Sequence, residues 1–134
     1  MPATDVVYFR EADGSVPILE WLREVARRDR RAAEKCVAQI GVLRDFGHEL
    51  RRPTVDYLRD GIYELRVRVS RAQYRILYFF HGREAVVVTH GLTKEKKVPL
   101  REIERALRRK HVFEKNPTFH DRQRRAKSTK SSRR

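Results

Sequence analysis

Residues 61–99 read GIYELRVRVSRAQYRILYFFHGREAVVVTHGLTKEKKVP and contain three strand-like apolar runs with arginines set into them. The first run, residues 63–69, alternates apolar and charged side chains with a period of two, which predicts a half-buried strand. Residues 73–80 and 85–89 are more continuously apolar, which predicts more fully buried strands. Because only short turns separate the runs, we expect a largely antiparallel sheet.

The residues before this stretch predict a strand and a helical hairpin. Residues 6–9 form a short apolar run, and Ser15 is a suitable N-cap for a helix with Pro17 in its first turn. Asp29 can cap a second helix, which Gly47 ends. The apolar positions at helical spacing are Ile18, Leu22, Val25 and Ala26 in the first helix and Ala33, Cys36, Val37, Ile40 and Leu43 in the second.

The remaining segments complete the predicted fold. Residues 48–57 are polar and contain Pro53, so we interpret them as a connector. Pro99 opens a last helix with Leu100 on its apolar face. We therefore predict an α+β fold: an N-terminal strand and helical hairpin packed on a mainly antiparallel four-stranded sheet with a C-terminal helix. The domain is expected over residues 1–116, followed by a basic, disordered tail over residues 117–134.

Composition restricts the class of protein. The 134 residues carry a formal net charge of +14, and residues 122–134 hold seven Lys or Arg and no acid, which leaves +7 on the rest. This charge favours a phosphate-rich or acidic protein partner without choosing between them. The single Cys36 excludes an internal disulfide and fits a reducing cytoplasm. No apolar run approaches the ~20 residues that span a bilayer, so we expect a soluble cytoplasmic protein with no membrane partner.

Two arginines in the central strands are the leading candidates for chemistry. If a two-residue turn joins the strands, Arg66 lies directly opposite Arg75, and like charges in that position destabilise a ladder by about 0.2–1 kcal/mol. A protein that keeps such a pair can use it to clamp an anion, since the guanidinium fork binds phosphate bidentately. The alternative is that each arginine pairs with a carboxylate, such as Glu64 or Glu84.

Other basic residues can extend this surface. Lys94 and Lys97 can take part in proton transfer, and Lys96 lies in the same loop, although a solvated basic loop is the alternative. His90, at the predicted end of a buried strand, can face the groove that these basic residues would line. Further cations on this surface, expected to bind RNA, are Arg68 and Arg71. The histidines show no metal-ligand spacing, so we expect no metal and no cofactor.

Four pieces of the chain resemble the RelE/ParE toxin superfamily, and within it the HigB-like, phage-derived branch. They are LRDGIYELR (58–66), QYRILYFF (73–80), VVVTHGLTKEKKVP (86–99) and REIERALRR (101–109). The resemblance implies a RelE-like α+β toxin of a type II toxin–antitoxin system. Such toxins cleave mRNA, usually in the ribosomal A site, and are silenced by an antitoxin encoded beside them.

The resemblance also implies residue roles. Arg66 ends the ELR motif and Arg75 lies in the YRILY strand, and both positions face RNA phosphates in the family. Lys97 matches the lysine of the family's K-x-P element. The chain departs from the family where it has Lys94-Glu95 in place of a lysine pair, and it lacks the tyrosine that some relatives carry at the start of the last helix.

Three functions remain open at this stage. The first is an mRNA endoribonuclease that inhibits translation, and the second is a ParE-like inhibitor of DNA gyrase without nuclease activity. The third is a non-catalytic RNA-binding regulator. For a toxin, we expect mRNA and the ribosome as partners, together with a helix-turn-helix antitoxin. The antitoxin contact is expected on the helical hairpin, at Arg23, Arg27, Arg30 and Arg31.

Deletion of residues 122–134 is expected to weaken non-specific RNA binding and to flatten its salt dependence. Each phosphate neutralised on a single strand contributes about 0.7 to the slope of log affinity against log salt, so the slope should fall by several units. Fluorescence anisotropy with a labelled single-stranded RNA at a series of salt concentrations measures it. An unchanged slope would mean that these cations do not contact nucleic acid.

Overall fold

The computed structural model describes residues 5–83, 85–93 and 96–120. These residues form three α-helices, one 3-10 helix and one five-stranded sheet. The elements in chain order are β1 (Asp5–Tyr8), α1 (Pro17–Arg28), α2 (Arg30–Phe46), η1 (Gly47–Glu49), β2 (Val55–Arg59), β3 (Ile62–Val69), β4 (Ala72–His81), β5 (Ala85–Thr93) and α3 (Leu100–Lys115). Residues 121–134, which make up most of the predicted tail, lie outside the described residues.

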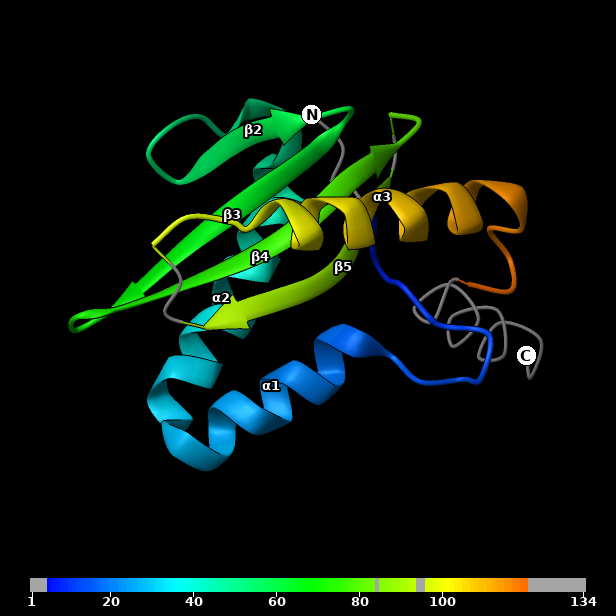
Figure 1. Ribbon diagram of the computed structural model, residues 1–134. Helices are drawn as coiled ribbons and strands as arrows, with labels where there is room; N and C mark the ends of the chain where they lie inside the picture. The colour runs from blue at the N-terminus through cyan, green and yellow to red at the C-terminus, as the bar shows by residue number, and fades with distance from the viewer. Residues whose placement is uncertain (1–4, 84, 94–95, 121–134) are drawn as a thin grey trace, which may run out of the picture.

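The sheet is mixed, with the strand order β1-β5-β4-β3-β2 (Figure 1). β1 runs parallel to β5, and the other neighbours are antiparallel. The prediction of an α+β fold is confirmed, but the predicted count of four strands is wrong. The missed strand is β2, which begins in the expected connector and pairs with β3, with Val55 opposite Leu65. Pro53 precedes this edge strand and therefore does not interrupt its ladder.

The hairpin of β3 and β4 has the predicted register. Ser70 and Arg71 form the turn, Val69 lies opposite Ala72, and Arg66 lies opposite Arg75. β5 continues to Thr93, well past the predicted end at Thr89, because a bulge at Thr89 lets the ladder resume after it.

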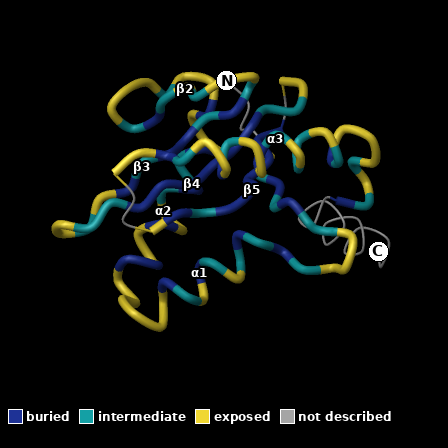
Figure 2. The backbone as a smooth tube through the Cα atoms, in the orientation of Figure 1, coloured by how far each residue is buried: buried dark blue, intermediate teal, exposed yellow. Residues whose placement is uncertain are grey.

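Two layers of helix cover the two faces of the sheet. α1 and α2 pack on one face, and α3 crosses part of the other (Figure 1). Figure 2 shows the central strands buried and the outer sides of the helices exposed. The apolar side chains that fill the hairpin side include Ile18, Leu22, Leu43, Ile76 and Tyr78. Those that fill the α3 side include Val7, Phe9, Leu77, Phe79 and Phe113.

Some helix predictions need correction. Asp29 caps α2 as expected, accepting a hydrogen bond from the Ala32 amide at 3.1 Å. Ser15 does not cap α1: Val16 occupies the N-cap position, and the Ser15 hydroxyl donates to Asp13 instead. On the last helix, Leu100 is 56% exposed, because it lies in the first turn, before the helix crosses the sheet.

Trp21 of α1 lies directly over β5. Its Nε1 donates a hydrogen bond to Thr93 Oγ1 at 2.9 Å, and its ring covers the backbone of Gly91. A Cβ atom at residue 91 would lie 2.3 Å from the ring, closer than carbon atoms can approach. Gly91 is therefore the residue that allows α1 to pack on the end of the sheet.

The Gly91→Ala substitution is expected to lower the free energy of unfolding by about 1–3 kcal/mol, because the new methyl group displaces Trp21. Gly41→Ala is the matched control: its Cβ would meet nothing within 4 Å, and alanine in a helix is favoured by about 0.5–1 kcal/mol. Denaturant unfolding followed by circular dichroism measures both. Equal stability of the Gly91→Ala variant and the wild type would contradict this packing.

Candidate functional site

Arg66 and Arg75 form an ion-pair cluster with two carboxylates on the α3 side of the sheet. Arg75 Nη1 donates to Glu64 Oε1 at 2.5 Å. Arg66 Nη2 donates to Glu64 Oε2 at 3.4 Å and to Asp56 Oδ2 at 3.0 Å. Asp56 belongs to β2 and lies opposite Glu64 in the ladder. The structure therefore has the carboxylate pairing that the sequence left as an alternative, with Glu64 bridging the two arginines.

The two guanidinium groups differ in exposure. The Arg75 side chain is only 10% exposed, and its Nη2 also donates to the Lys96 carbonyl at 2.6 Å. The Arg66 side chain is 32% exposed. Although burial opposes the shift, the hydrogen bond and charge of Arg52 and the charge of Arg66 hold the pKa of Asp56 below its ordinary value. Arg75 is thus a fixed cation, while Arg66 has an edge open to a ligand.

The other predicted cations that the structure describes are exposed. Lys96 and Lys97 are exposed in the segment that leads to α3, and Arg68 and Arg71 are exposed near the tip of the β3–β4 hairpin. The bond from Arg75 to the Lys96 carbonyl attaches that segment to the arginine cluster. Lys94, which was also predicted to be catalytic, lies outside the described residues, as do Glu84 and Glu95.

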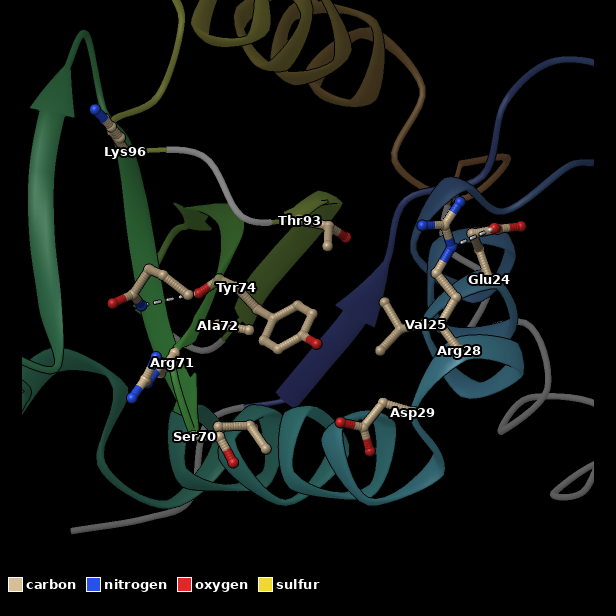
Figure 3. A pocket seen from close by; sticks show the side chains of 12 residues that line it. Glu24, Val25, Arg28, Asp29, Ser70, Arg71, Ala72, Tyr74, Thr93 and Lys96 are labelled. Carbon is tan, nitrogen blue, oxygen red and sulfur yellow. Dashed lines mark hydrogen bonds and ion pairs between the residues drawn. The ribbon is translucent and has the colours of Figure 1, made fainter.

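A groove of about 870 Å³ lies between the hairpin of β3 and β4 and the junction of α1 with α2 (Figure 3). Its charged lining comes from distant parts of the sequence: Glu24, Arg28, Asp29, Arg71 and Lys96. Among the lining cations, Arg28 donates a hydrogen bond to Glu24. The other two, Arg71 and Lys96, are the ones that the sequence predicted to bind RNA. The sequence did not indicate the contribution of α1, because helix-surface charges carry no signal of what faces them.

His90 lies on the side of the sheet that holds Arg66 and Arg75, but α3 covers it, so it does not line the basic surface as predicted. It is 6% exposed and lies within β5, on the side that α3 covers. Its Nε2 lies 3.0 Å from Glu102 Oε1, and its Nδ1 lies 2.8 Å from Thr89 Oγ1. The prediction failed because β5 is longer than the apolar pattern indicated, which places His90 in the middle of a covered strand.

The electrostatic environment keeps His90 neutral. Burial, reinforced by the charges of Arg109 and Arg105, lowers the pKa of His90 to about 3. A neutral imidazole can donate from Nε2 to Glu102 and accept at Nδ1 from the Thr89 hydroxyl. His90 therefore connects β5 to α3 as a structural residue and is not available to bind RNA.

Other classes of site have no support in the described part of the chain. It contains no group of three or more His, Cys, Asp and Glu side chains placed to hold a metal ion. The thiol of Cys36 is buried in the core, and burial raises its pKa to about 11. No helix in the described ranges is both long and apolar enough to cross a bilayer.

The fold and the cluster define a small basic α+β domain with an arginine pair on one sheet face. A family model matches residues 20–111, from α1 into α3, and this range contains the whole cluster. The chain belongs to this family, the Gp49-like phage-derived proteins (DUF891), which is a family of RelE-like toxins. The predicted resemblance is confirmed at that level, and its HigB-like detail stays a prediction. A comparison with curated proteins gave no significant match.

Replacing His90 with glutamine is expected to remove part of the acid sensitivity of the protein. The pKa of His90 rises from about 3 in the folded chain to 6.5 on unfolding, so the unfolded state binds an extra proton between these values. The free energy of unfolding should therefore fall as pH drops below 6.5, by up to about 1.4 kcal/mol per pH unit from this group.

Denaturant unfolding at pH values between 4 and 8 measures this dependence, with exposed His111→Gln as the control. The pH dependence of His90→Gln should be flatter than that of the wild type, and His111→Gln should match the wild type. Parallel curves for all three proteins would show that His90 titrates normally in the folded state.

Proposed function

We propose that this chain is the toxin of a type II toxin–antitoxin system and that it acts as a ribosome-dependent mRNA endoribonuclease in the cytoplasm. The observation that supports this most is the pair of arginines from adjacent strands, bridged by Glu64 beside a basic segment. Membership of a RelE-like toxin family supports the toxin role. No cofactor is required for the reaction described below.

Fixed cations such as these two arginines suit the charge that develops during RNA cleavage. The 2′-hydroxyl of one nucleotide attacks the adjacent phosphate, a bond to phosphorus forms, and the bond to the 5′-oxygen of the next nucleotide breaks. The products are a 2′,3′-cyclic phosphate and a free 5′-hydroxyl. Negative charge builds on the non-bridging oxygens, and fixed cations aimed at that charge commonly contribute the largest part of the rate enhancement.

The cluster divides this work between its two arginines. Arg66 has an exposed edge, so a phosphate can approach it and replace Asp56 as its partner. Arg75 is held by Glu64 and the Lys96 carbonyl, so it supplies fixed positive charge beneath the phosphate. In this proposal, Glu64 is a positioning residue, and Lys94 and Lys97 move protons to and from the reacting oxygens.

Substitutions in the cluster are expected to lower RNA cleavage by about 100-fold or more, the usual loss for one stabilising group. Arg75→Lys keeps a cation but loses the fork that reaches both Glu64 and Lys96, and Arg66→Ala removes the exposed guanidinium. Arg44→Ala is the control, since Arg44 is 59% exposed on α2, on the opposite side of the sheet.

The measurements are growth arrest on expression, mRNA cleavage in a reconstituted translation system, and end-group analysis of the fragments. Circular dichroism shows whether each variant is folded. If a substitution at buried Arg75 unfolds the chain, the Arg66→Ala variant alone still tests whether the cluster takes part in cleavage. Full cleavage by folded Arg66→Ala and Arg75→Lys would exclude this mechanism. Loss of DNA supercoiling while translation continues would favour the gyrase function instead.

A further inference from the structure

The helical hairpin carries a second groove, which is lined by residues of α1 and α2 alone. It has a volume of about 460 Å³ and lies between α1 and α2. Its lining residues are Leu19, Leu22, Arg23, Ala26, Arg30, Ala33, Glu34 and Val37. The floor is therefore aliphatic, and the charged residues stand at its edges.

The groove contains two apolar residues that the helical pattern predicted to be core. Val37 is 51% exposed and Ala26 is also exposed. Each lies one residue from a buried position, Cys36 or Val25, and one residue corresponds to about 100° around a helix. Each helix thus has an apolar residue beside its buried face that packing leaves exposed, and the Val37 side chain is about half exposed. This apolar lining is small, and together with the charges around it, it gives a surface that a partner side chain can cover.

The charges around the groove define the chemistry of a partner. Arg23, Arg27, Arg30 and Arg31 are all exposed on α1 and α2. Arg30 and Glu34 are 3.7 Å apart, but both are largely exposed, so this ion pair is weak. Arg23 has no ion pair with any described residue. The edges of the groove are therefore net basic and complementary to acidic side chains.

We propose that this groove binds an amphipathic helix that places aliphatic side chains on the floor and acidic side chains beside Arg23 and Arg30. A helix suits the space between two packed helices, because its side chains at i, i+3, i+4 and i+7 fill such a groove. A second copy of this chain fits less well, since it would bring basic edges against basic edges. RNA fits less well because the floor offers it no polar contact.

The position of the groove separates this interaction from the arginine cluster. The groove is lined by residues of α1 and α2 alone. These helices cover one face of the sheet and α3 crosses the other (Figure 1), and Arg66 is partly exposed on the α3 side. A helix bound here leaves that face uncovered. The identity of the helix as part of an antitoxin rests on the proposed function, whereas the chemistry of the groove does not.

A synthetic helical peptide tests the proposal with the full-length chain. The probe has about 18 residues, with Leu at i, i+3, i+4 and i+7 and Glu at the flanking positions, and a side-chain staple keeps it helical. Fluorescence anisotropy at physiological salt measures its binding. Two control peptides are a scrambled sequence with the same charge and a version with Lys in place of Glu. We expect saturable binding of the first peptide only.

Two variants test the groove itself. Val37→Asp puts a charge on the aliphatic floor and should weaken binding by about tenfold or more, because burying an unpaired charge costs over 1.4 kcal/mol. Ala26→Leu fills the groove and should also weaken binding. Phe46→Asp is the matched control, since Phe46 is 52% exposed at the end of the same helix.

The outcomes separate this inference from the proposed function. Equal affinity of the scrambled peptide, or equal affinities of Val37→Asp, Ala26→Leu and Phe46→Asp, would overturn the groove as the binding site. A concentration-dependent dimer that Val37→Asp dissociates in analytical ultracentrifugation would assign the groove to self-association instead. Peptide binding is measured without RNA, so a chain that fails to cleave mRNA still gives a clear result here.

Discussion

The pairing of β3 with β4 places Arg66 directly opposite Arg75, and much of the structure around the cluster serves to accommodate that juxtaposition. Two like charges in one ladder need counter-charges, and a buried arginine needs them most, since an unpaired charge in a protein interior is very costly. Glu64 bridges the pair from within β3, while Asp56 reaches Arg66 from β2. The edge strand therefore completes the electrostatics of the cluster as well as extending the sheet.

The two faces of the sheet have separate roles. The hairpin side is a continuous apolar core under α1 and α2, closed at one end by Trp21 over Gly91. The α3 side combines an apolar region with two polar clusters, of which one is buried and one is partly open. His90 and Glu102 form the buried cluster, and their environment favours a neutral imidazole. The partly open cluster contains Arg66, whose guanidinium group a ligand can reach.

Periodicity and turn chemistry predicted most of the fold correctly. The register of the β3–β4 hairpin followed from its two-residue turn, and Asp29 capped α2 as its side chain predicted. Strand β2 was missed because an edge strand of five residues carries little pattern, and because the polar composition and Pro53 indicated a connector. His90 was misplaced because a bulge extends β5, and a bulge depends on how two strands fit together.

The sequence by itself placed Arg66 opposite Arg75 on the condition that a two-residue turn joins their strands, and the structure has that turn. The sequence also determined the strong positive charge and the order of the helices and of the strands other than β2. Only the tertiary structure decided which carboxylates neutralise the arginines and how exposed each guanidinium is. The same holds for Val37, which helical spacing grouped with the core and which packing left exposed. Periodicity describes one element at a time, whereas ion pairs and burial depend on which elements pack together.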